Sequence, residues 1–399
     1  MLKKILSILL STIIFFSLSS CQNNKVNNNA ITIWINRGND EQISAFAELC
    51  NDYSEDNNVD IKIINTDINT VEYLSAMNSK SSGPDIVWGM SSEETGFLVD
   101  NNALEEIPSD FDNIDDYDNK DLIENTSING TRYAVPISQE TLALYYNKDI
   151  VNEVPNDMDE LIESAKVNGM TFPINNSYFS YGFIATCGGY IFKNNEGSFD
   201  KDDIGLDNTG AIKGYEILQK FTVDNQIISS DITDNNAELN FTNGNIAYYI
   251  GEQKQIDNFK QTNINFGVTT IPSIDGNAFK PFKEIKMAFV NPSSDKKDKS
   301  YDVLKYLSQN SGKILIEHEN KIPVLKKDIS SKEFTDNDYL QAFYAQIENA
   351  QVTPNINYLK AYWEVMNTKL SLLNNNKITP EECGQKTKKD LIEYMSQMG

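Results

Sequence analysis

Residues with catalytic or metal-binding chemistry are few in this sequence, and their spacing excludes several common sites. The single histidine, His318, leaves no second imidazole for a histidine-rich zinc site. The sequence contains no Gly-x-Ser-x-Gly elbow, no His-Glu-x-x-His helix and no Gly-x-x-x-x-Gly-Lys-Ser/Thr loop. We therefore expect no serine-hydrolase or zinc-protease chemistry, no ATP site and no cofactor.

Two acidic segments have part of the pattern of a calcium-binding loop. The segment from Asp110 to Asp118 lacks the glycine at position six and the glutamate at position twelve of an EF-hand loop. The segment from Asp200 to Gly205 has the glycine, but an apolar residue takes a ligand position and no glutamate follows at position twelve. Both segments are predicted to be solvated loops, and no metal is expected.

The cysteines do not form a recognisable framework. After Cys21, three remain at Cys50, Cys187 and Cys383, an odd number without a Cys-x-x-Cys pair. This pattern indicates neither a disulfide scaffold nor a zinc ribbon, so buried free thiols are expected.

Length and charge limit the class of protein. The chain has 399 residues, which predicts two domains at ~150 residues each. Lys plus Arg is 34 and Asp plus Glu is 58, a net charge of −24, while 40% of the residues are hydrophobic. A globular protein is expected, and nucleic acid is excluded as a partner because its binding depends on basic side chains.

The first residues have the pattern of a targeting segment. Lys3 and Lys4 precede an apolar run from Ile5 to Phe16, shorter than the ~20 residues of a membrane-spanning helix. The end of the run, Leu18-Ser19-Ser20-Cys21, resembles a bacterial lipobox. An ordinary secretory signal with an incidental cysteine is the alternative.

On the lipobox interpretation, residues 1–20 are a lipoprotein signal peptide and Cys21 carries the lipid anchor. The Asn-rich residues 21–29 then form a flexible tether. This predicts a protein held by lipid alone on the outer face of the bacterial cytoplasmic membrane, on its extracellular or periplasmic side.

The elements after the tether predict an α/β fold. Residues 31–35 are an apolar strand, residues 43–53 have helical spacing, and residues 59–64 and 84–89 are further strands. Strands alternating with helices predict a parallel, helix-covered sheet, whose ligands sit at the carboxyl ends of strands. The loops after Ile35 and Val87 are therefore candidate binding loops.

The middle of the chain changes pattern. Residues 133–150 form a long extended segment interrupted by Pro136, which we interpret as a crossing between two domains. The remaining predicted elements complete a second α/β domain and a helical C-terminus: helices at 158–167, 178–186 and 210–224, strands at 246–250, 265–271 and 285–290, and helices at 339–349, 358–373 and 380–395.

Eight short blocks, in order along the chain, resemble one known family. They are Ile33–Asn36, Gly83–Val87, Tyr145–Asp149, Gly188–Lys193, Gly205–Asn208, Phe266–Val268, Lys280–Phe282 and Glu348–Gln351. They resemble the bacterial maltose- and maltodextrin-binding proteins of ABC importers (extracellular solute-binding protein family 1), from Ala30 to about Leu373.

The resemblance implies a two-lobed periplasmic-binding-protein fold of type II, with the ligand cleft between lobes that close about a multi-segment hinge. The N-terminal lobe would contain residues 30–139 and 288–338, and the C-terminal lobe residues 143–283 and 342–399. The implied role is not enzymatic. A monomer would capture an oligosaccharide, maltodextrin-like by this resemblance, and deliver it to the membrane permease subunits of an ABC transporter.

The resemblance also implies ligand contacts at the end of the first strand and in the crossing segment. Asn36 matches a family asparagine, and Arg37 follows it, but Gly38 and Asn39 replace an Asp-Lys pair that binds sugar hydroxyls. Glu140 matches a family glutamate that accepts hydrogen bonds from sugar. Its alternative role is that of an exposed loop carboxylate.

Three aromatic residues match the family's stacking positions. Tyr178 matches a stacking tyrosine, Tyr181 falls where the family has an aromatic residue beside it, and Trp363 matches a stacking tryptophan near the C-terminus. Each could instead pack in the hydrophobic core.

Further positions depart from the family pattern and bear on the choice of sugar. Trp88 lies one position before the family tryptophan, and the acid-base pair that follows becomes a Ser-Glu pair ending at Glu93. Asn176 replaces a glutamate, Lys254 a stacking tryptophan and Asn367 an arginine. Linear α-1,4 glucan and another oligosaccharide both stay open as ligands, with Trp88, Glu93 and Asn176 as candidate contacts.

Two other functions remain open. An extracellular glycan-degrading enzyme would use Glu140 with a second carboxylate, for which Glu93 is the candidate, at ~5 to 9.5 Å across the sugar. A sugar chemoreceptor without transport would use the same cleft, because a scaffold does not fix its function.

Overall fold

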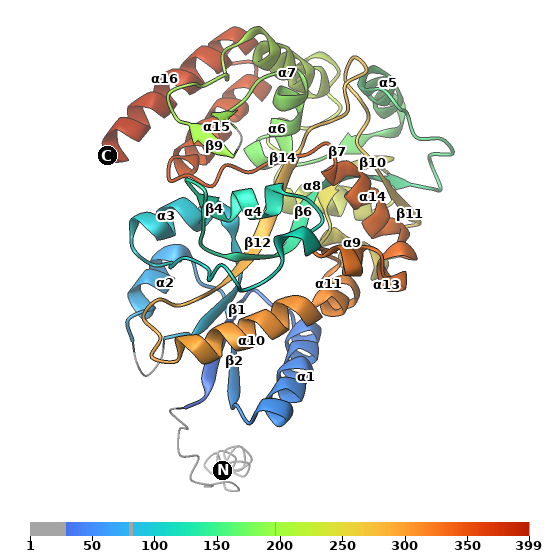
Figure 1. Ribbon diagram of the computed structural model, residues 1–399. Helices are drawn as coiled ribbons and strands as arrows, with labels where there is room; N and C mark the ends of the chain where they lie inside the picture. Colours follow the sequence, from blue (N-terminus) through green and yellow to red (C-terminus); the bar gives the residue numbers. More distant parts are fainter. Residues whose placement is uncertain (1–28, 80–82, 196, 399) are drawn as a thin grey trace, which may run out of the picture. The chain divides into compact units, whose positions relative to one another are not determined.

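A mixed sheet of ten strands runs through the computed structural model, which describes residues 29–79, 83–195 and 197–398 (Figure 1). Its main path has the order β2-β1-β3-β12-β6-β10-β7, with β11 and β13 paired to β6 and β14 paired to β12. The strands of this sheet are β1 (Ile31–Asn36), β2 (Ile61–Thr66), β3 (Ile86–Ser91), β6 (Val135–Asn147), β7 (Met170–Thr171), β10 (Tyr248–Glu252), β11 (Phe266–Thr269), β12 (Phe282–Val290), β13 (Ile322–Pro323) and β14 (Gln351–Val352). Two small hairpins accompany it: β4 (Ser127–Ile128) with β5 (Thr131–Arg132), and β8 (Lys193–Asn195) with β9 (Ser198–Asp200).

The parallel pairing predicted from the sequence is confirmed for part of the sheet. β1 pairs in parallel with both β2 and β3, as the alternation of strands and helices predicts, and β10–β7 and β12–β14 are also parallel. The prediction is wrong at the centre of the sheet, because β12 runs antiparallel to both β3 and β6. β12 comes from a distant part of the chain, so no βαβ connection imposes a parallel direction on it.

The long extended segment predicted around residue 140 is one strand, β6. Its first half pairs with β12, and its second half pairs with β10 and β11. β6 therefore connects the strand group that contains β1–β3 to the group that contains β10. The boundaries predicted for the two lobes remain a prediction.

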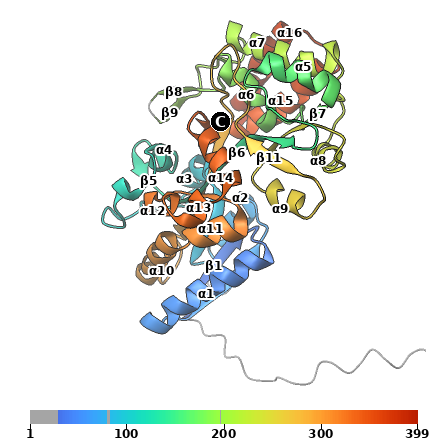
Figure 2. The same cartoon turned by 90° about the vertical axis from the view of Figure 1, so that its right-hand side faces the viewer.

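The helices gather around these two strand groups, as Figures 1 and 2 show. α1 contacts α10 and α11 beside β1 and β2, whereas α6, α7, α15 and α16 contact one another at the other end of the fold. The α-helices are α1 (Asp40–Asn57), α2 (Thr70–Ala76), α3 (Thr95–Asp100), α4 (Asp121–Asn125), α5 (Met158–Asn168), α6 (Ser177–Thr186), α7 (Thr209–Gln219), α8 (Asp234–Thr242), α9 (Gln255–Lys260), α10 (Lys297–Asn310), α11 (Gly312–Glu319), α12 (Lys326–Ile329), α13 (Lys332–Thr335), α14 (Asp338–Ile347), α15 (Leu359–Asn374) and α16 (Pro380–Met398). Shorter helical turns are η1 (Ser92–Glu94), η2 (Ile114–Asp116) and the π-turn η3 (Lys220–Asp224).

Asparagine side chains begin several of these helices. Asn39, Asn176 and Asn208 each accept a backbone N–H from the first turn of α1, α6 and α7. Such caps satisfy amides that have no partner within the helix. At the other end of α5, Gly169 adopts a φ of 77°, a conformation that favours glycine. The local sequence thus sets where these helices begin and end.

The cysteines of the described residues form no disulfide. Cys50 and Cys383 are buried free thiols as predicted, while Cys187 is free but only half-buried. None of the helices in this part of the chain is long and apolar enough to cross a membrane. The predicted signal peptide, the anchor at Cys21 and most of the predicted tether lie outside the described residues.

Candidate functional site

A cavity of about 200 Å³ lies where β12, the turn after β3, the first turn of α6 and the second and third turns of α15 meet. Its walls combine carboxyl groups, amides, hydroxyls and two aromatic rings. The lining residues are Glu93, Asn176, Ser177, Tyr178, Glu284, Thr353, Trp363 and Asn367.

The register of β6 against β12 places two acidic side chains next to this cavity. Glu140 of β6 is directly opposite Glu284 of β12, and like charges in this position repel each other. Two ammonium groups compensate. Lys286 forms an ion pair with Glu284, and Lys321 Nζ lies 3.4 Å from Glu140 Oε1.

A second carboxylate shares the ammonium of Lys321. Glu319 Oε2 lies 2.8 Å from Lys321 Nζ, and the side chain of Glu319 is only 6% exposed. Burial raises the pKa of Glu319 although Lys321 opposes the shift. For Glu140, burial also favours the neutral acid, but the ammoniums of Lys286 and Lys321 outweigh it and lower the pKa. Glu140 is therefore a charged hydrogen-bond acceptor at neutral pH.

Glu93 has the opposite electrostatic environment. Burial, followed by repulsion from Glu284 and Glu94, raises the pKa of Glu93 to about 8, although Lys286 and a hydrogen bond with Trp363 act against the rise. Glu93 is thus mostly protonated at pH 7 and can donate as well as accept a hydrogen bond.

Two hydroxyls of the cavity wall are buried without a hydrogen-bond partner among the described residues. These are the Ser177 side-chain oxygen and the Tyr178 hydroxyl, both in the first turn of α6. Backbone amides of the same turn are already satisfied, since Ser177 N donates to Asn367 Oδ1 and Tyr178 N donates to Asn176 Oδ1. Burial, followed by the carboxylates around it, raises the pKa of Tyr178. The free groups are therefore neutral hydroxyls with unused hydrogen-bonding capacity.

Five of the nine ligand contacts predicted from the sequence lie in or beside this site. Glu93, Asn176, Tyr178 and Trp363 line the cavity together. Glu140 joins them through the β6–β12 pairing, and its charge acts on Tyr178. The structure thus assembles residues that are up to 270 positions apart in the sequence.

Two predicted contacts, Trp88 and Tyr181, belong to the core instead. Trp88 is 1% exposed and packs on Phe46, with ring centroids 4.9 Å apart, because alternate residues of β3 face opposite sides of the sheet. Tyr181 is 4% exposed, stacks on Phe282 at 3.9 Å and donates to Gln351. Tyr181 lies about one helical turn from Tyr178 but borders a different hollow. Neither side chain is retained as a contact in this cavity.

The remaining predicted contacts lie at the end of β1. The Asn36 side chain accepts a hydrogen bond from Ile68 N, and Arg37 Nε lies 2.5 Å from Asp67 Oδ1 with both side chains about three-quarters exposed. Neither Asn36 nor Arg37 lines the cavity. Their role as ligand contacts stays a prediction.

Sequence reasoning missed Glu284, Lys286 and Lys321. A signal for the first two was present, because charged residues interrupt an otherwise apolar strand, and a charged residue in a buried strand needs a partner. Lys321 precedes the two-residue strand β13, and only the pairing of that strand with β6 brings it to Glu140.

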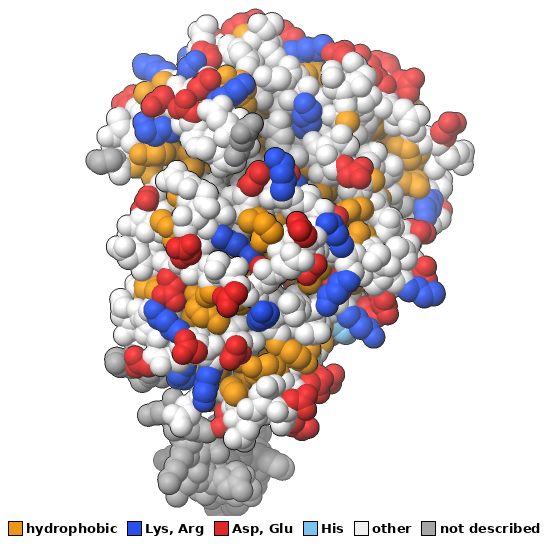
Figure 3. All heavy atoms as spheres, viewed as in Figure 1, with side chains coloured by type: hydrophobic (Ala, Val, Ile, Leu, Met, Phe, Trp, Pro, Cys, Tyr) orange, Lys and Arg blue, Asp and Glu red, His pale blue; other side chains and the backbone are white. Residues whose placement is uncertain are grey.

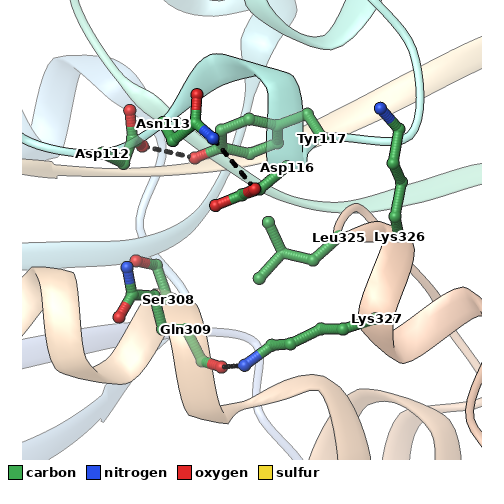
Figure 4. A pocket seen from close by; sticks show the side chains of 9 residues that line it. All are labelled: Asp112, Asn113, Asp116, Tyr117, Ser308, Gln309, Leu325, Lys326 and Lys327. Carbon is green, nitrogen blue, oxygen red and sulfur yellow. Dashed lines mark hydrogen bonds between the residues drawn. The ribbon is translucent and has the colours of Figure 1, made fainter.

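A second hollow, of about 380 Å³, lies between the acidic segment around Asp112 and the helices α10 and α12 (Figure 4). Its polar groups are largely engaged with one another. Asp112 accepts two hydrogen bonds from Arg132, Asn113 donates to Asp116, and Lys327 donates to a backbone carbonyl. No group of three or more residues suited to hold a metal ion occurs in the described part of the chain. Over the face in Figure 3, acidic and basic side chains are intermixed rather than gathered in one patch.

Comparison with known proteins agrees with this architecture. Residues 48–342 match the family described as bacterial extracellular solute-binding proteins. A maltooligosaccharide ABC transporter solute-binding lipoprotein of Streptococcus pneumoniae is 29% identical over 84% of this chain and 81% of its own. A galactooligosaccharide-binding protein of Bacillus subtilis is 25% identical over 83% of this chain and 82% of its own.

Solved structures show the same fold. The maltose-maltodextrin binding protein of Alicyclobacillus acidocaldarius superposes with a TM-score of 0.82 at 25% identity, covering 91% of this chain and 99% of that one. A cyclo/maltodextrin-binding protein complexed with maltotetraose gives a TM-score of 0.84 at 21% identity, covering 93% and 98%. The fold is the two-lobed solute-binding fold, and the chain belongs to the bacterial extracellular solute-binding protein family.

Proposed function

We propose that this protein is the oligosaccharide-binding component of an ABC importer, with the cavity between Tyr178 and Trp363 as part of its sugar site. The observation that carries the proposal is the composition of this cavity. Aromatic rings offer flat apolar faces, while carboxyls, amides and unpartnered hydroxyls offer hydrogen bonds. Sugar rings have both apolar faces and hydroxyl edges, so this combination suits them.

The relatives support an oligosaccharide as the ligand class. Their names include galactooligosaccharide, maltodextrin and maltooligosaccharide binding, so related chains differ in the sugar they take. In this chain, Glu140 would accept hydroxyl protons as a carboxylate, and Asn176 and Asn367 border the same space. A maltodextrin-like sugar is our first candidate.

The setting follows from the same proposal. Cys21 would be lipidated and would hold a monomer on the outer face of the cytoplasmic membrane, beside the permease subunits that receive the sugar. The two lobes, with the boundaries predicted above, would close on the ligand. Closure from a 1:99 to a 99:1 population needs about 5.5 kcal/mol of differential affinity between the open and closed forms.

The enzymatic alternative would pair Glu140 with Glu93, and the charge states of these two groups do not argue against it, so our choice of binding rests on the names of the relatives. A glycosidase needs one carboxyl group that stays protonated to act as the acid and a second that acts on the sugar ring. Glu140 lies between Lys286 and Lys321, which keep its pKa low and its carboxylate charged. The relatives are named as binding proteins. We therefore propose a binding role without catalysis.

Thermal unfolding of the chain from Gln22 onward, against a panel of oligosaccharides, tests the proposal. The panel contains maltose, longer maltodextrins, galacto-, cello-, xylo- and manno-oligosaccharides, and single sugars. A ligand at 100 times its dissociation constant adds about 2.7 kcal/mol of stability, which raises the melting temperature by a few degrees.

The variant Trp363→Ala locates the effect, with Tyr339→Ala as its matched control. Tyr339 is also a partly buried aromatic residue on a helix, but it packs on Phe266 away from the cavity. We expect Trp363→Ala to lose the sugar-induced shift and Tyr339→Ala to keep it. The proposal is contradicted if no sugar of the panel raises the melting temperature of the wild-type protein, or if Trp363→Ala shows the same rise as the wild type.

A further inference from the structure

The carboxyl groups beside the cavity outnumber the ammonium groups that pair with them. Glu93 and Glu284 share the single ammonium of Lys286, which forms its ion pair with Glu284. Glu93 has only a hydrogen bond with Trp363. A buried carboxylate without a cation of its own is costly, so this corner of the site has a place for one positive charge.

The groups around this place also suit a cation. The rings of Trp363 and Tyr178 line the same cavity as Glu93 and Glu284, and the Trp363 side chain forms a hydrogen bond with Glu93. Aromatic faces attract ammonium groups, and the effect grows when water is excluded. Ser177 and Tyr178 add buried hydroxyl oxygens that have no partner among the described residues and can accept from an N–H.

The charged groups that act most strongly on Glu93 lie on β12 and η1. They are Glu284 and Lys286 on β12 and Glu94 on η1, while α15 contributes only the neutral Trp363. Three acids, Glu93 included, therefore face one ammonium.

We propose that Glu93 and Glu284, with Trp363 and Tyr178, form a subsite for a sugar unit that bears a protonated amine. This inference rests on the proposed function and narrows its ligand to oligosaccharides with an amino sugar. The sugar ammonium donates to the two carboxyl groups, takes the place of the proton on Glu93 and lies against the aromatic rings, while a hydroxyl in its place leaves Glu93 protonated and neutral. A cavity of about 200 Å³ has room for one such unit rather than for the whole chain.

The test compares three trisaccharides of the same β-1,4 linkage by titration calorimetry at pH 7 in 0.15 M salt. They are the fully deacetylated amine trimer of glucosamine, its N-acetylated form, and cellotriose, which has a hydroxyl in place of each amine. We expect the amine trimer to bind at least about tenfold more tightly than cellotriose, because hydrogen bonds to charged groups contribute more than neutral ones. The N-acetylated trimer should behave like cellotriose or bind more weakly.

Two variants show whether the preference for the amine trimer comes from the subsite or from the overall negative charge of the protein. Glu93→Gln should reduce the preference for the amine trimer to less than about threefold, since one carboxylate is lost and the shape is kept. Glu163→Gln removes the same charge from α5, where the side chain is 71% exposed, and should keep the preference. Equal loss in both variants, or an unchanged preference in Glu93→Gln, overturns the proposal.

Proton release gives a second readout that needs only the wild-type protein. At pH 5.5, where the sugar amines are charged and Glu93 carries a proton, an arriving ammonium should displace that proton, which is visible as a dependence of the binding heat on the ionisation enthalpy of the buffer. Amine binding without proton release contradicts the inference. If cellotriose or maltotriose binds and the amine trimer gains nothing, the inference fails while the proposed function stands. If no oligosaccharide of any class binds, both fail.

Discussion

Replacing Lys321 by methionine should destabilise the protein because one ammonium serves two buried carboxylates. Lys321 Nζ lies 2.8 Å from Glu319 Oε2 and 3.4 Å from Glu140 Oε1, and its side chain is 25% exposed. At an effective dielectric constant of ~20, each attraction is ~5 to 6 kcal/mol before desolvation and the repulsion between the two glutamates are subtracted. Breaking one partner out of a buried pair costs about 3–5 kcal/mol, and we expect a loss in that range at pH 7.5.

The pH dependence of this loss has a definite sign. Lys286 and Lys321 lower the pKa of Glu140 below its ordinary value of 4.5, so its pairing stabilises the fold above that pH. The contribution disappears as the pH falls through the lowered pKa. Without Lys321, Glu140 and Glu319 take up protons more readily, so at low pH the variant no longer has to bury two unpaired charges and its loss of stability becomes smaller. The difference between wild type and Lys321→Met should therefore shrink between pH 7.5 and pH 4.5.

Urea unfolding followed by circular dichroism at both pH values measures this difference. Lys332→Met is the matched control, since Lys332 pairs with Asp336 on the surface with side chains 84% and 60% exposed. It should cost less than about 1 kcal/mol at either pH. The reasoning is refuted if Lys321→Met costs no more than Lys332→Met, or if its cost grows on acidification.

Two further substitutions test the packing around the site. Trp88→Ala should cost about 3–5 kcal/mol in urea unfolding, because it leaves a cavity in the core beside Phe46. The folded protein should keep its sugar affinity, and a changed affinity would show that Trp88 contributes to the binding site. Gly96→Ala should cost about 1–3 kcal/mol in urea unfolding, because its Cβ would lie 2.6 Å from the backbone oxygen of Asn355. Gly130→Ala is the control for backbone strain alone, because Gly130 has a φ of 80° and its Cβ would meet no atom within 4 Å. A larger loss of stability in Gly130→Ala than in Gly96→Ala would contradict the steric explanation.

Local patterns in the sequence were sufficient to predict most of the elements. The strand Ile31–Asn36, the helix Asp40–Asn57 and the long strand Val135–Asn147 were all predicted, because periodicity and polar interruptions are properties of neighbouring residues. The antiparallel position of β12 was not, since pairing between distant strands leaves little trace in a local pattern. The same limit explains why Lys321 was missed.

The four aromatic residues chosen as candidate contacts lie in different surroundings. Trp363 and Tyr178, which match family positions, line one cavity. Tyr181, which also matches a family position, and Trp88, which lies one position before the family tryptophan, are in the core. An alignment with a family shows which helix or strand a residue belongs to. A shift of that alignment by one residue, however, turns the side chain to a different face of the element.

An oligosaccharide bound against Trp363 should change the intrinsic fluorescence of the protein. The sequence has three tryptophans, of which Trp34 and Trp88 are at most 9% exposed and only Trp363 lines the cavity. We expect a sugar that stabilises the protein to change the tryptophan emission in a saturable way, Trp88→Phe to keep this response and Trp363→Phe to lose it. A saturable response that persists in Trp363→Phe would contradict the assignment of the site.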